Sequence, residues 1–238
     1  MLNCPHCHGL VEENTEICPH CHQPLAASSP VIPGGIVQPG KYLRQGWELF
    51  KLNPGGYVGF ALVFFVIQVV LSLFPRLGGL TSLVISGPLY AGFYLVSAKL
   101  LQRQTPIFQD FFGGFQFFLP LLLLTLISTL FIIVGLILFI LPGIFLMVCY
   151  IFAAMIVIDR RLDFWPAMEL SRRTVQSQWF GFFIFFLLLM LINLGGVILL
   201  GVGLLVSMPV SAAAVAAAYN DIFGLQSDYS GSMPQPKM

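Results

Sequence analysis

The chain has 238 residues, of which 58% are hydrophobic and only 9% are charged, and its net charge at pH 7 is +1. Soluble globular domains carry about 25% charged residues. This composition therefore excludes an ordinary soluble protein and predicts an all-α integral membrane protein. The near-zero net charge, and the lack of a basic patch with interleaved aromatic residues, also exclude a nucleic-acid-binding protein.

Residues 1–23 contain four of the five cysteines and all four histidines of the chain. The pattern Cys-Pro-His-Cys occurs there twice. Two such pairs supply four thiolates, the ligand set of a closed structural zinc site with no open position for catalysis. The sequence therefore predicts a small zinc ribbon over residues 1–23, with Zn²⁺ supplying most of its folding free energy. The predicted ligands are Cys4, Cys7, Cys18 and Cys21, and the alternative is two disulfides or free thiols.

These two cysteine pairs resemble the knuckles of the short zinc ribbons found at the ends of many bacterial membrane proteins. The usual knuckle of those ribbons reads CPxCG, and here His8 and His22 replace the glycine. Glycine tolerates a left-handed backbone better than histidine does. Exchange of a cysteine ligand for His8 or His22 therefore stays open.

The segment 24–40 is rich in Pro, Gly, Ser and Ala and has neither charge nor helical period. Such a composition predicts a flexible linker, and the alternative is a ribbon docked rigidly on the rest of the chain. The segment 41–53 then shows an amphipathic pattern. Leu43, Trp47 and Phe50 fall on one helical face, and charged residues on another. We expect a helix that lies in the membrane interface.

Four long stretches lack Lys, Arg, Asp, Glu and His, and they cover residues 57–75, 77–98, 111–158 and 174–220. A membrane-spanning helix needs about 20 apolar residues, so the first two stretches are one span each and the last two are two spans each. Pro142-Gly143 and the glycine-rich region 195–209 predict the two breaks. The total is six spans within a membrane domain of residues 41–224, and the polar residues 225–238 predict a disordered tail.

Two further amphipathic segments precede later spans. In the first, Thr105 and Pro106 predict a helix start. In the second, over 163–179, Phe164, Met168, Val175 and Trp179 recur at near-helical spacing, and polar residues occupy the other side. The order of amphipathic helix, span, turn and span thus recurs over 41–103, 105–160 and 163–223, with Pro88, Pro142 and Pro209 near the second spans. We expect a pseudo-threefold repeat with three interfacial helices.

Charge predicts the orientation of the spans. Ten of the eleven Lys and Arg residues fall on the face that holds both termini, and only Arg76 falls on the other. The positive-inside rule then places both termini in the cytoplasm, for a bacterial inner-membrane protein. A reducing cytoplasm keeps the cysteines as thiolates that can bind zinc. The alanine-rich run 211–218 predicts a helix at the centre of the bundle or at a dimer contact.

Few residues are candidates for chemistry. No paired carboxylates, nucleophile elbow or phosphate loop occurs, so we do not expect an enzyme. Gln68 and Asn193 lie within apolar spans, where they either join helices by hydrogen bonds or line a polar path for a substrate. Four arginines follow the fourth span, where they either bind acidic lipid headgroups or only set the topology. They are Arg160, Arg161, Arg172 and Arg173.

The stretches LPGIFLMVCYIFAAMIVID, FWPAMELSRRTVQSQWFGFF and AAAYNDIFG, within residues 141–224, resemble a family of bacterial membrane proteins. That family includes the membrane domain of membrane-anchored glycerophosphodiester phosphodiesterases and related six-helix inner-membrane proteins. Its pattern A-x-x-x-S-x-x-x-V is matched by Ala167, Ser171 and Val175. The acidic and histidine residues of the family's hydrolase domain have no counterpart here, so the resemblance implies a fold and a location and no phosphodiesterase activity.

These observations lead to one expected function and one alternative. We expect a non-enzymatic adaptor or regulator, whose cytoplasmic zinc ribbon recruits a cytoplasmic or membrane protein to a six-helix body that contacts membrane lipids. The alternative is a transporter or a lipid-translocating facilitator, which the repeat and the interfacial helices favour.

Overall fold

The computed structural model describes residues 2–3, 10–11, 37–74, 78–199 and 201–226. The chain divides into two compact units, Met1–Gly35 and Ile36–Met238. In the first unit, strand β1 (Leu2–Asn3) pairs antiparallel with strand β2 (Leu10–Val11). The four predicted zinc ligands, residues 24–36 of the predicted linker and the tail from 227 onward lie outside the described residues. The zinc ribbon, the linker and the disordered tail therefore stay predictions.

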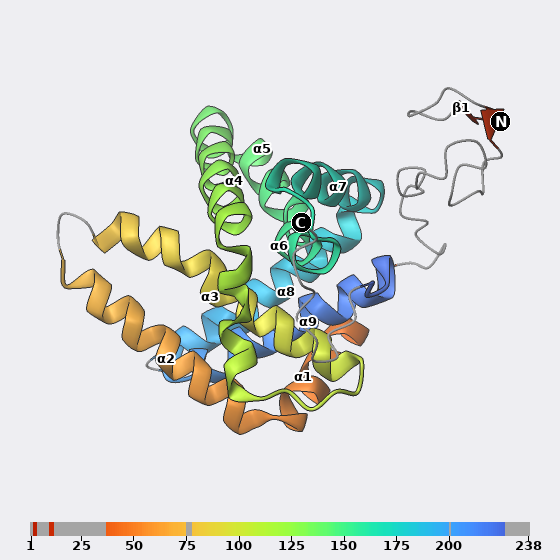
Figure 1. Cartoon of the computed structure of the whole chain (residues 1–238). Coiled ribbons are helices and arrows are strands. Elements are labelled where there is room, and N and C mark those ends of the chain that lie inside the picture. Colours follow the sequence, from red (N-terminus) through yellow and green to blue (C-terminus); the bar gives the residue numbers. More distant parts are fainter. Residues whose placement is uncertain (1, 4–9, 12–36, 75–77, 200, 227–238) are drawn as a thin grey trace, which may run out of the picture. The chain divides into compact units, whose positions relative to one another are not determined.

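The second unit is helical throughout its described part (Figure 1). Its elements are α1 (Pro39–Leu52), α2 (Pro54–Ser72), α3 (Gly78–Leu101), the 3-10 helix η1 (Phe108–Phe117), α4 (Phe118–Leu138), α5 (Ile140–Cys149), α6 (Ala153–Arg160), α7 (Phe164–Ser177), α8 (Trp179–Ile198) and α9 (Leu204–Phe223).

Within the described residues, six helical segments are long and apolar enough to cross a membrane. They are Pro54–Ser72, Thr81–Leu101, Phe108–Leu138, Ile140–Arg160, Trp179–Ile198 and Leu204–Phe223. The predicted multi-pass, α-helical membrane protein with six candidate spans is thus confirmed. Which membrane holds the protein and which face the termini occupy stay predictions.

The apolar stretches 111–158 and 174–220 are each interrupted at the glycine and proline residues that predicted a break. Phe139 is extended between α4 and α5, and Pro142 lies in the first turn of α5, where its missing N–H has no helical partner to lose. Gly201, with φ +76°, lies in the turn between α8 and α9 and uses the left-handed region that glycine favours. Pro88 and Pro209 instead lie inside α3 and α9, away from the helix starts.

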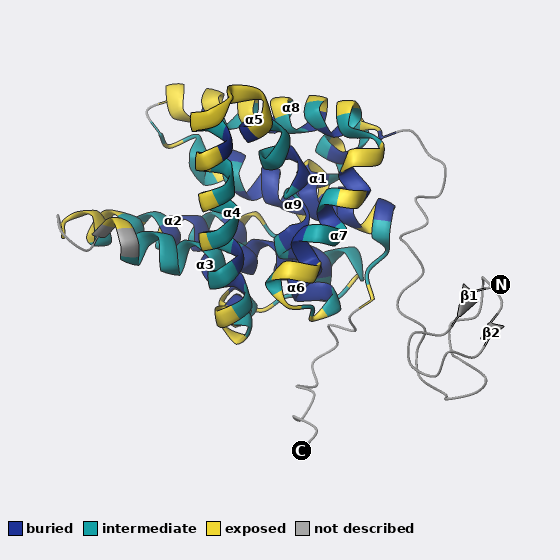
Figure 2. Ribbon diagram, turned by 90° about the horizontal axis from the view of Figure 1, so that it is seen from above, coloured by how far each residue is buried: buried dark blue, intermediate teal, exposed yellow. Residues whose placement is uncertain are grey.

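The spans pair into three hairpins, and the second span of each is the more buried one. In their most apolar stretches, 56%, 44% and 72% of the residues of the second, fourth and sixth spans are buried. The corresponding values for the first, third and fifth spans are 22%, 17% and 22%. The second spans therefore form the core, and exposed residues concentrate on the first spans and at the hairpin ends (Figure 2).

Helix α9 is at the centre of this core. Every residue from Ser211 to Tyr219 is buried, and seven of them are Ala or Val with little side chain. A Cβ atom added to Gly46 of α1 would lie 2.6 Å from the backbone nitrogen of Ala214. Small residues allow such close approach of membrane helices, so the prediction that this helix is central in the bundle is confirmed.

Each amphipathic segment packs on the second span of a hairpin. The segment η1 packs on α3, α7 packs on α5 and α6, and α1 packs on α9. Gly92 of α3 directly faces the carbonyl oxygen of Phe111, and Gly114 of η1 faces the carbonyl oxygen of Pro88. The order of the elements is the one that the predicted threefold repeat requires, and the repeat itself stays a prediction.

The face with which α1 packs on the bundle shares only Phe50 with the predicted apolar face. The buried face of α1 is formed by Tyr42, Gly46, Leu49 and Phe50, and Trp47 is 45% exposed. Glycine faces α9 because the backbones approach too closely there for a larger side chain.

One local prediction was wrong, and it concerns the start of η1. Thr105 and Pro106 precede the helix, which starts at Phe108. The Asp110 carboxylate accepts a hydrogen bond from the Ile107 N–H at 2.8 Å and so satisfies, from inside the helix, a backbone donor at its start. Of the four apolar residues predicted on one side of the segment 163–179, Met168 and Val175 are buried and Phe164 is half-buried in α7. The fourth, Trp179, is half-buried and begins α8.

The contact between Gly92 and η1 gives a first test. We expect Gly92→Ala to destabilise the protein by about 1–3 kcal/mol, because the new methyl group would overlap the Phe111 carbonyl. Gly195→Ala is the matched control, since nothing lies within 4 Å of a Cβ atom there. Thermal denaturation in detergent measures both variants. Equal melting temperatures for the two would contradict the packing of η1 on α3.

Candidate functional site

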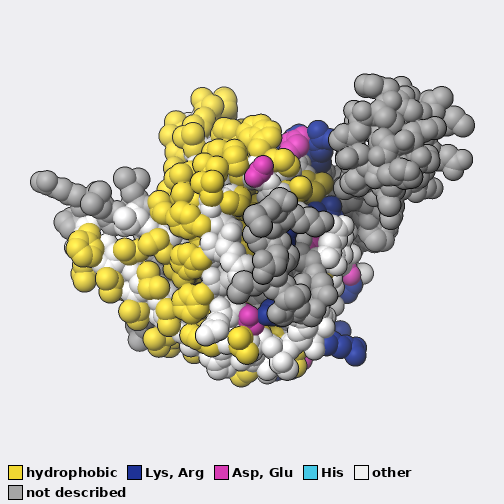
Figure 3. Space-filling model, in the orientation of Figure 1, with side chains coloured by type: hydrophobic (Ala, Val, Ile, Leu, Met, Phe, Trp, Pro, Cys, Tyr) yellow, Lys and Arg dark blue, Asp and Glu magenta, His cyan; other side chains and the backbone are white. Residues whose placement is uncertain are grey.

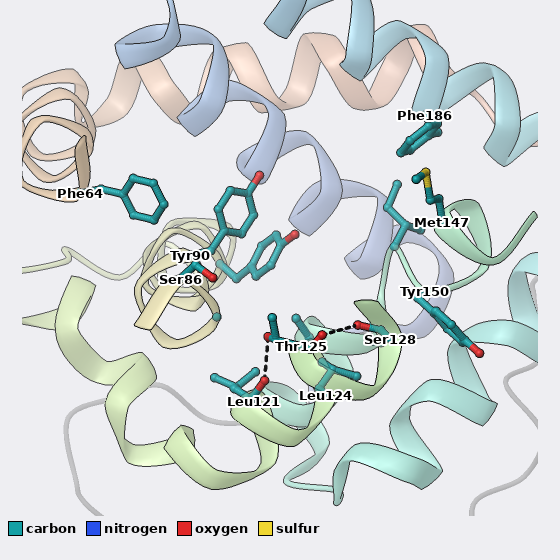
Figure 4. Close-up of a pocket in the computed structure, with 15 residues that line it drawn as sticks. Phe64, Ser86, Tyr90, Leu121, Leu124, Thr125, Ser128, Met147, Tyr150 and Phe186 are labelled. Carbon is teal, nitrogen blue, oxygen red and sulfur yellow. Dashed lines mark hydrogen bonds between the residues drawn. The ribbon is translucent and has the colours of Figure 1, made fainter. Parts of the chain in front are cut away.

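A cavity of about 410 Å³ lies between α3, α4, α5 and α6 in the second unit (Figure 4). Phe64 of α2 and Phe186 of α8 complete its wall. Most lining residues are apolar, and none of them is Lys, Arg, His, Asp or Glu. Six lining residues carry a hydroxyl group, and they are Ser86, Tyr90, Tyr94, Thr125, Ser128 and Tyr150. Ligand sites in proteins commonly combine such an apolar wall with a few polar groups.

Three of these hydroxyl groups donate their protons to carbonyl groups one turn back in their own helix. Thr125 donates to Leu121 at 2.8 Å, and Ser128 donates to Thr125 at 3.3 Å (Figure 4). Ser86 of α3 donates to Leu83 at 2.9 Å. A hydroxyl oxygen has two lone pairs, so each of these groups still has acceptor capacity.

Gly87 brings α3 and α4 together at this cavity. A Cβ atom at Gly87 would lie 2.6 Å from the Thr125 hydroxyl oxygen and 3.3 Å from the Leu121 carbonyl oxygen. Every residue other than glycine would therefore displace the Thr125 hydroxyl. The rings of Tyr90 and Tyr94 extend the wall along α3, with their centroids 5.3 Å apart in an edge-to-face contact.

The two polar residues predicted for a substrate path do not line this cavity. The Gln68 side-chain oxygen accepts a hydrogen bond from the Ser82 hydroxyl and so joins α2 to α3. The Asn193 amide nitrogen donates to the Ser211 hydroxyl at 2.7 Å and so joins α8 to α9. Its amide oxygen accepts from Ser207 at 3.1 Å. The structure places both residues in helix–helix hydrogen bonds and does not bring them together.

The predicted arginines lie on two successive elements. On α7, Arg172 contacts the Glu169 carboxylate at 2.8 Å, and Arg173 contacts it at 2.6 Å. At the end of α6, Arg160 lies over the ring of Phe223 at 5.4 Å, and Arg161 is exposed with φ 51°. In the view of Figure 3 the described Lys and Arg side chains lie toward one side of the surface and the hydrophobic side chains toward the other.

Glu169 offsets part of this positive charge. Hydrogen bonds from Arg172, and then from Arg173, lower the pKa of the Glu169 carboxyl group to about 2. The carboxylate is therefore ionised at every physiological pH. Because Arg173 is exposed to solvent and Glu169 is partly exposed, these ion pairs contribute little to stability.

Asp159, near the end of α6, is a buried acid. Its side chain is 3% exposed and accepts a hydrogen bond from the Tyr219 hydroxyl at 2.8 Å. The Gln226 backbone N–H also donates to it, at 3.1 Å. Asp159 thus ties the end of α6 to α9 and to the segment that follows α9. No sequence signal marked this contact, because its partners are 60 and 67 positions away.

A second acid fixes α1 to the end of α9. Asp221 accepts hydrogen bonds from Lys41 at 2.7 Å and from the Tyr42 hydroxyl at 3.0 Å. Burial, and then the Asp221 carboxylate, raise the pKa of Tyr42 to about 12. The Tyr42 hydroxyl therefore stays protonated and keeps donating to Asp221 at every physiological pH.

Within the described part of the chain, no group of three or more His, Cys, Asp or Glu residues is placed to hold a metal ion. Cys149 is buried there, and its carbonyl oxygen accepts a hydrogen bond from Ser171 at 2.6 Å. Comparison of the chain with protein-family models, curated proteins and solved structures found no match. The resemblance to the phosphodiesterase membrane domains therefore stays a prediction.

The lowered pKa of Glu169 gives a second test. A carboxyl group with a lowered pKa in the folded state adds stability that is present above its unfolded value of 4.5 and is lost as the pH falls toward 2. We expect Glu169→Gln to lower the free energy of unfolding slightly at pH 6, by less than about 1 kcal/mol. The difference from the wild type should vanish between pH 4.5 and 2, as measured by denaturation in detergent at several pH values. A difference that grows in this range would contradict the ion pairs on α7.

Proposed function

We propose that the protein is a non-enzymatic membrane adaptor or regulator. Its six-helix body binds a lipid-like ligand in the cavity between α3, α4, α5 and α6, and its cysteine-rich N-terminal segment recruits a protein partner. The observation that supports ligand binding is an uncharged, hydroxyl-bearing cavity, whose Ser86, Thr125 and Ser128 hydroxyls keep acceptor capacity.

The N-terminal part of the proposal is supported by the sequence. Four thiolates in two Cys-x-x-Cys pairs are the ligand set of a structural zinc site. We assign Zn²⁺ to Cys4, Cys7, Cys18 and Cys21. The closed ligand set suits a recognition module and leaves no coordination position for catalysis.

The location that we propose is the bacterial inner membrane, with both termini in the cytoplasm. Its support is the excess of Lys and Arg on the face that holds the termini. The same face carries Arg160, Arg161, Arg172 and Arg173, and their proposed role is to contact acidic lipid headgroups. Arg161 and Arg173 are the exposed members of this group and so the most accessible to a headgroup.

The threefold repeat belongs to the same proposal. Its support is that α1, η1 and α7 each precede a hairpin with a lipid-facing first span and a buried second span. Each of them also packs on the second span of another hairpin. Such a cyclic arrangement leaves inter-hairpin spaces, one of which is the cavity.

Loss of the cysteines tests the recruitment role. We expect the double variant Cys4→Ser/Cys7→Ser to lose its one zinc ion per chain, measured by elemental analysis of the purified protein. It should also lose cytoplasmic partners from a pull-down while the six-helix body keeps its melting temperature. Cys149→Ser is the control, because this cysteine is buried in the body and should leave zinc content unchanged. Identical partner lists for the double variant and the wild type would contradict recruitment by this segment.

A second candidate function is lipid translocation, and the cavity is the observation that favours it. A translocation path needs room for polar groups between spans, which the hydroxyl-lined wall provides. Proteoliposomes with a fluorescent phospholipid and an external quencher measure the rate of lipid exchange between leaflets. For an adaptor we expect the rate of protein-free liposomes. A faster rate that Gly87→Leu abolishes would favour the facilitator instead.

A further inference from the structure

We infer that the cavity between α3, α4, α5 and α6 takes a neutral lipid whose polar head is an alcohol, with diacylglycerol as the type compound. This inference rests on the proposed function, because it specifies the ligand of the same cavity. It follows from the charge of the wall, from the direction of its hydrogen bonds and from the low burial of the span that contributes α4 to the wall.

The charge of the wall excludes ionised headgroups. None of the residues that line the cavity carries a charged side chain. A phosphate or ammonium group placed there would be removed from water without a counter-ion, which is strongly unfavourable. Moving an uncharged headgroup from water into the cavity costs far less free energy. Among membrane lipids, the cavity therefore selects those with neither phosphate nor ammonium.

The hydrogen bonds of the wall favour a head that donates. The hydroxyl protons of Ser86, Thr125 and Ser128 are all directed to backbone carbonyl groups. Their oxygens can therefore accept a hydrogen bond from a ligand and have no proton left to offer. A ligand alcohol supplies the missing donor. A ligand that carries only ester or ether oxygens would leave these acceptors unsatisfied in an apolar surrounding.

The tyrosines complete the match to an ester-linked lipid alcohol. Tyr90 and Tyr94 bring two phenol groups to the α3 side of the cavity, where their hydroxyl groups hydrogen-bond each other. One phenol proton of the pair is used in this bond, and the other is left for a ligand. The ester carbonyl groups next to the alcohol of a diacylglycerol are acceptors of the kind that a phenol proton satisfies. The rest of the wall, including Phe64, Leu124 and Met147, is apolar and suits the first part of an acyl chain.

The cavity also lies close to the source of such a ligand. Its wall includes α4, and only 17% of the most apolar stretch of that span is buried. Part of the cavity wall is therefore a span whose exposed residues we expect to contact lipid. Its volume of about 410 Å³ is near the lower end of the range for small-molecule sites. The head and the beginning of the chains fit within it, and the chain ends extend into lipid.

Binding of a soluble short-chain lipid to the purified full-length protein in detergent tests the inference. The probe is radiolabelled dioctanoylglycerol, and two competitors differ from it only at the head. One is its methyl ether, which lacks the donor, and the other is dioctanoyl phosphatidic acid, which is charged. We expect saturable binding of the alcohol, at least tenfold weaker competition by the methyl ether and no competition by the phosphatidic acid.

Matched variants on α4 assign the binding to this wall. Thr125→Val keeps the shape of the side chain and removes the acceptor, so we expect it to weaken binding of the alcohol about tenfold. Thr129→Val makes the same change on the same helix outside the cavity and should leave binding unchanged. Melting temperatures show whether each variant is folded. Ser128→Ala tests the neighbouring acceptor and is used if Thr125→Val does not fold.

The outcomes separate this inference from the proposed function. If the alcohol and its methyl ether bind equally, and both lose binding in Gly87→Leu, the inference that the head is an alcohol is overturned. The proposal that the cavity binds lipid then stands. Tighter binding of phosphatidic acid than of dioctanoylglycerol would overturn the inference that the ligand has an uncharged head. Binding of none of the three lipids would overturn the inference and the lipid-binding part of the proposed function together.

Discussion

The close packing of α9 is the constraint on which the rest of the body depends. Lipid tails are as apolar as leucine side chains, so the hydrophobic effect does not drive membrane helices together. Association must come from close contact and from hydrogen bonds between helices. The run of small residues from Ser211 to Ala218 permits that contact on all sides, and every residue in it is buried. Gly46 of α1 uses this surface directly.

Polar groups then fix the helices that surround α9. Tyr57 of α2 shares a hydrogen bond of 2.7 Å with Ser97 of α3, Asn193 joins α8 to α9, and Asp159 joins α6 to α9. Each pair satisfies groups that would otherwise be costly in an apolar surrounding. The cavity differs from these contacts, because its serine and threonine hydroxyls bond only within their own helices. Their remaining acceptor capacity is what makes the cavity a candidate site.

The cavity and the arginine-bearing helix share a structural element. Tyr150 and Ile151, in the short break between α5 and α6, line the cavity. The residue before them, Cys149, accepts a hydrogen bond from Ser171 of α7 through its carbonyl oxygen. Helix α7 also carries Glu169 and its arginines. The wall of the proposed lipid site is therefore in direct contact with the helix that we expect at the membrane surface.

The sequence by itself determined the number of candidate spans, the breaks near Pro142 and Gly201, and the close packing of the alanine-rich helix, whose place at the bundle centre or at a dimer contact it left open. These features depend on length, on local backbone restrictions and on side-chain size, which are properties of neighbouring residues. Only the tertiary structure decided that Ser86, Thr125 and Ser128 face one cavity, that Gln68 and Asn193 face other helices, and that Asp159 meets Tyr219. A span that is apolar all round has no polar face to orient it, so its facing residues are set by distant helices and leave no periodic signal in the sequence.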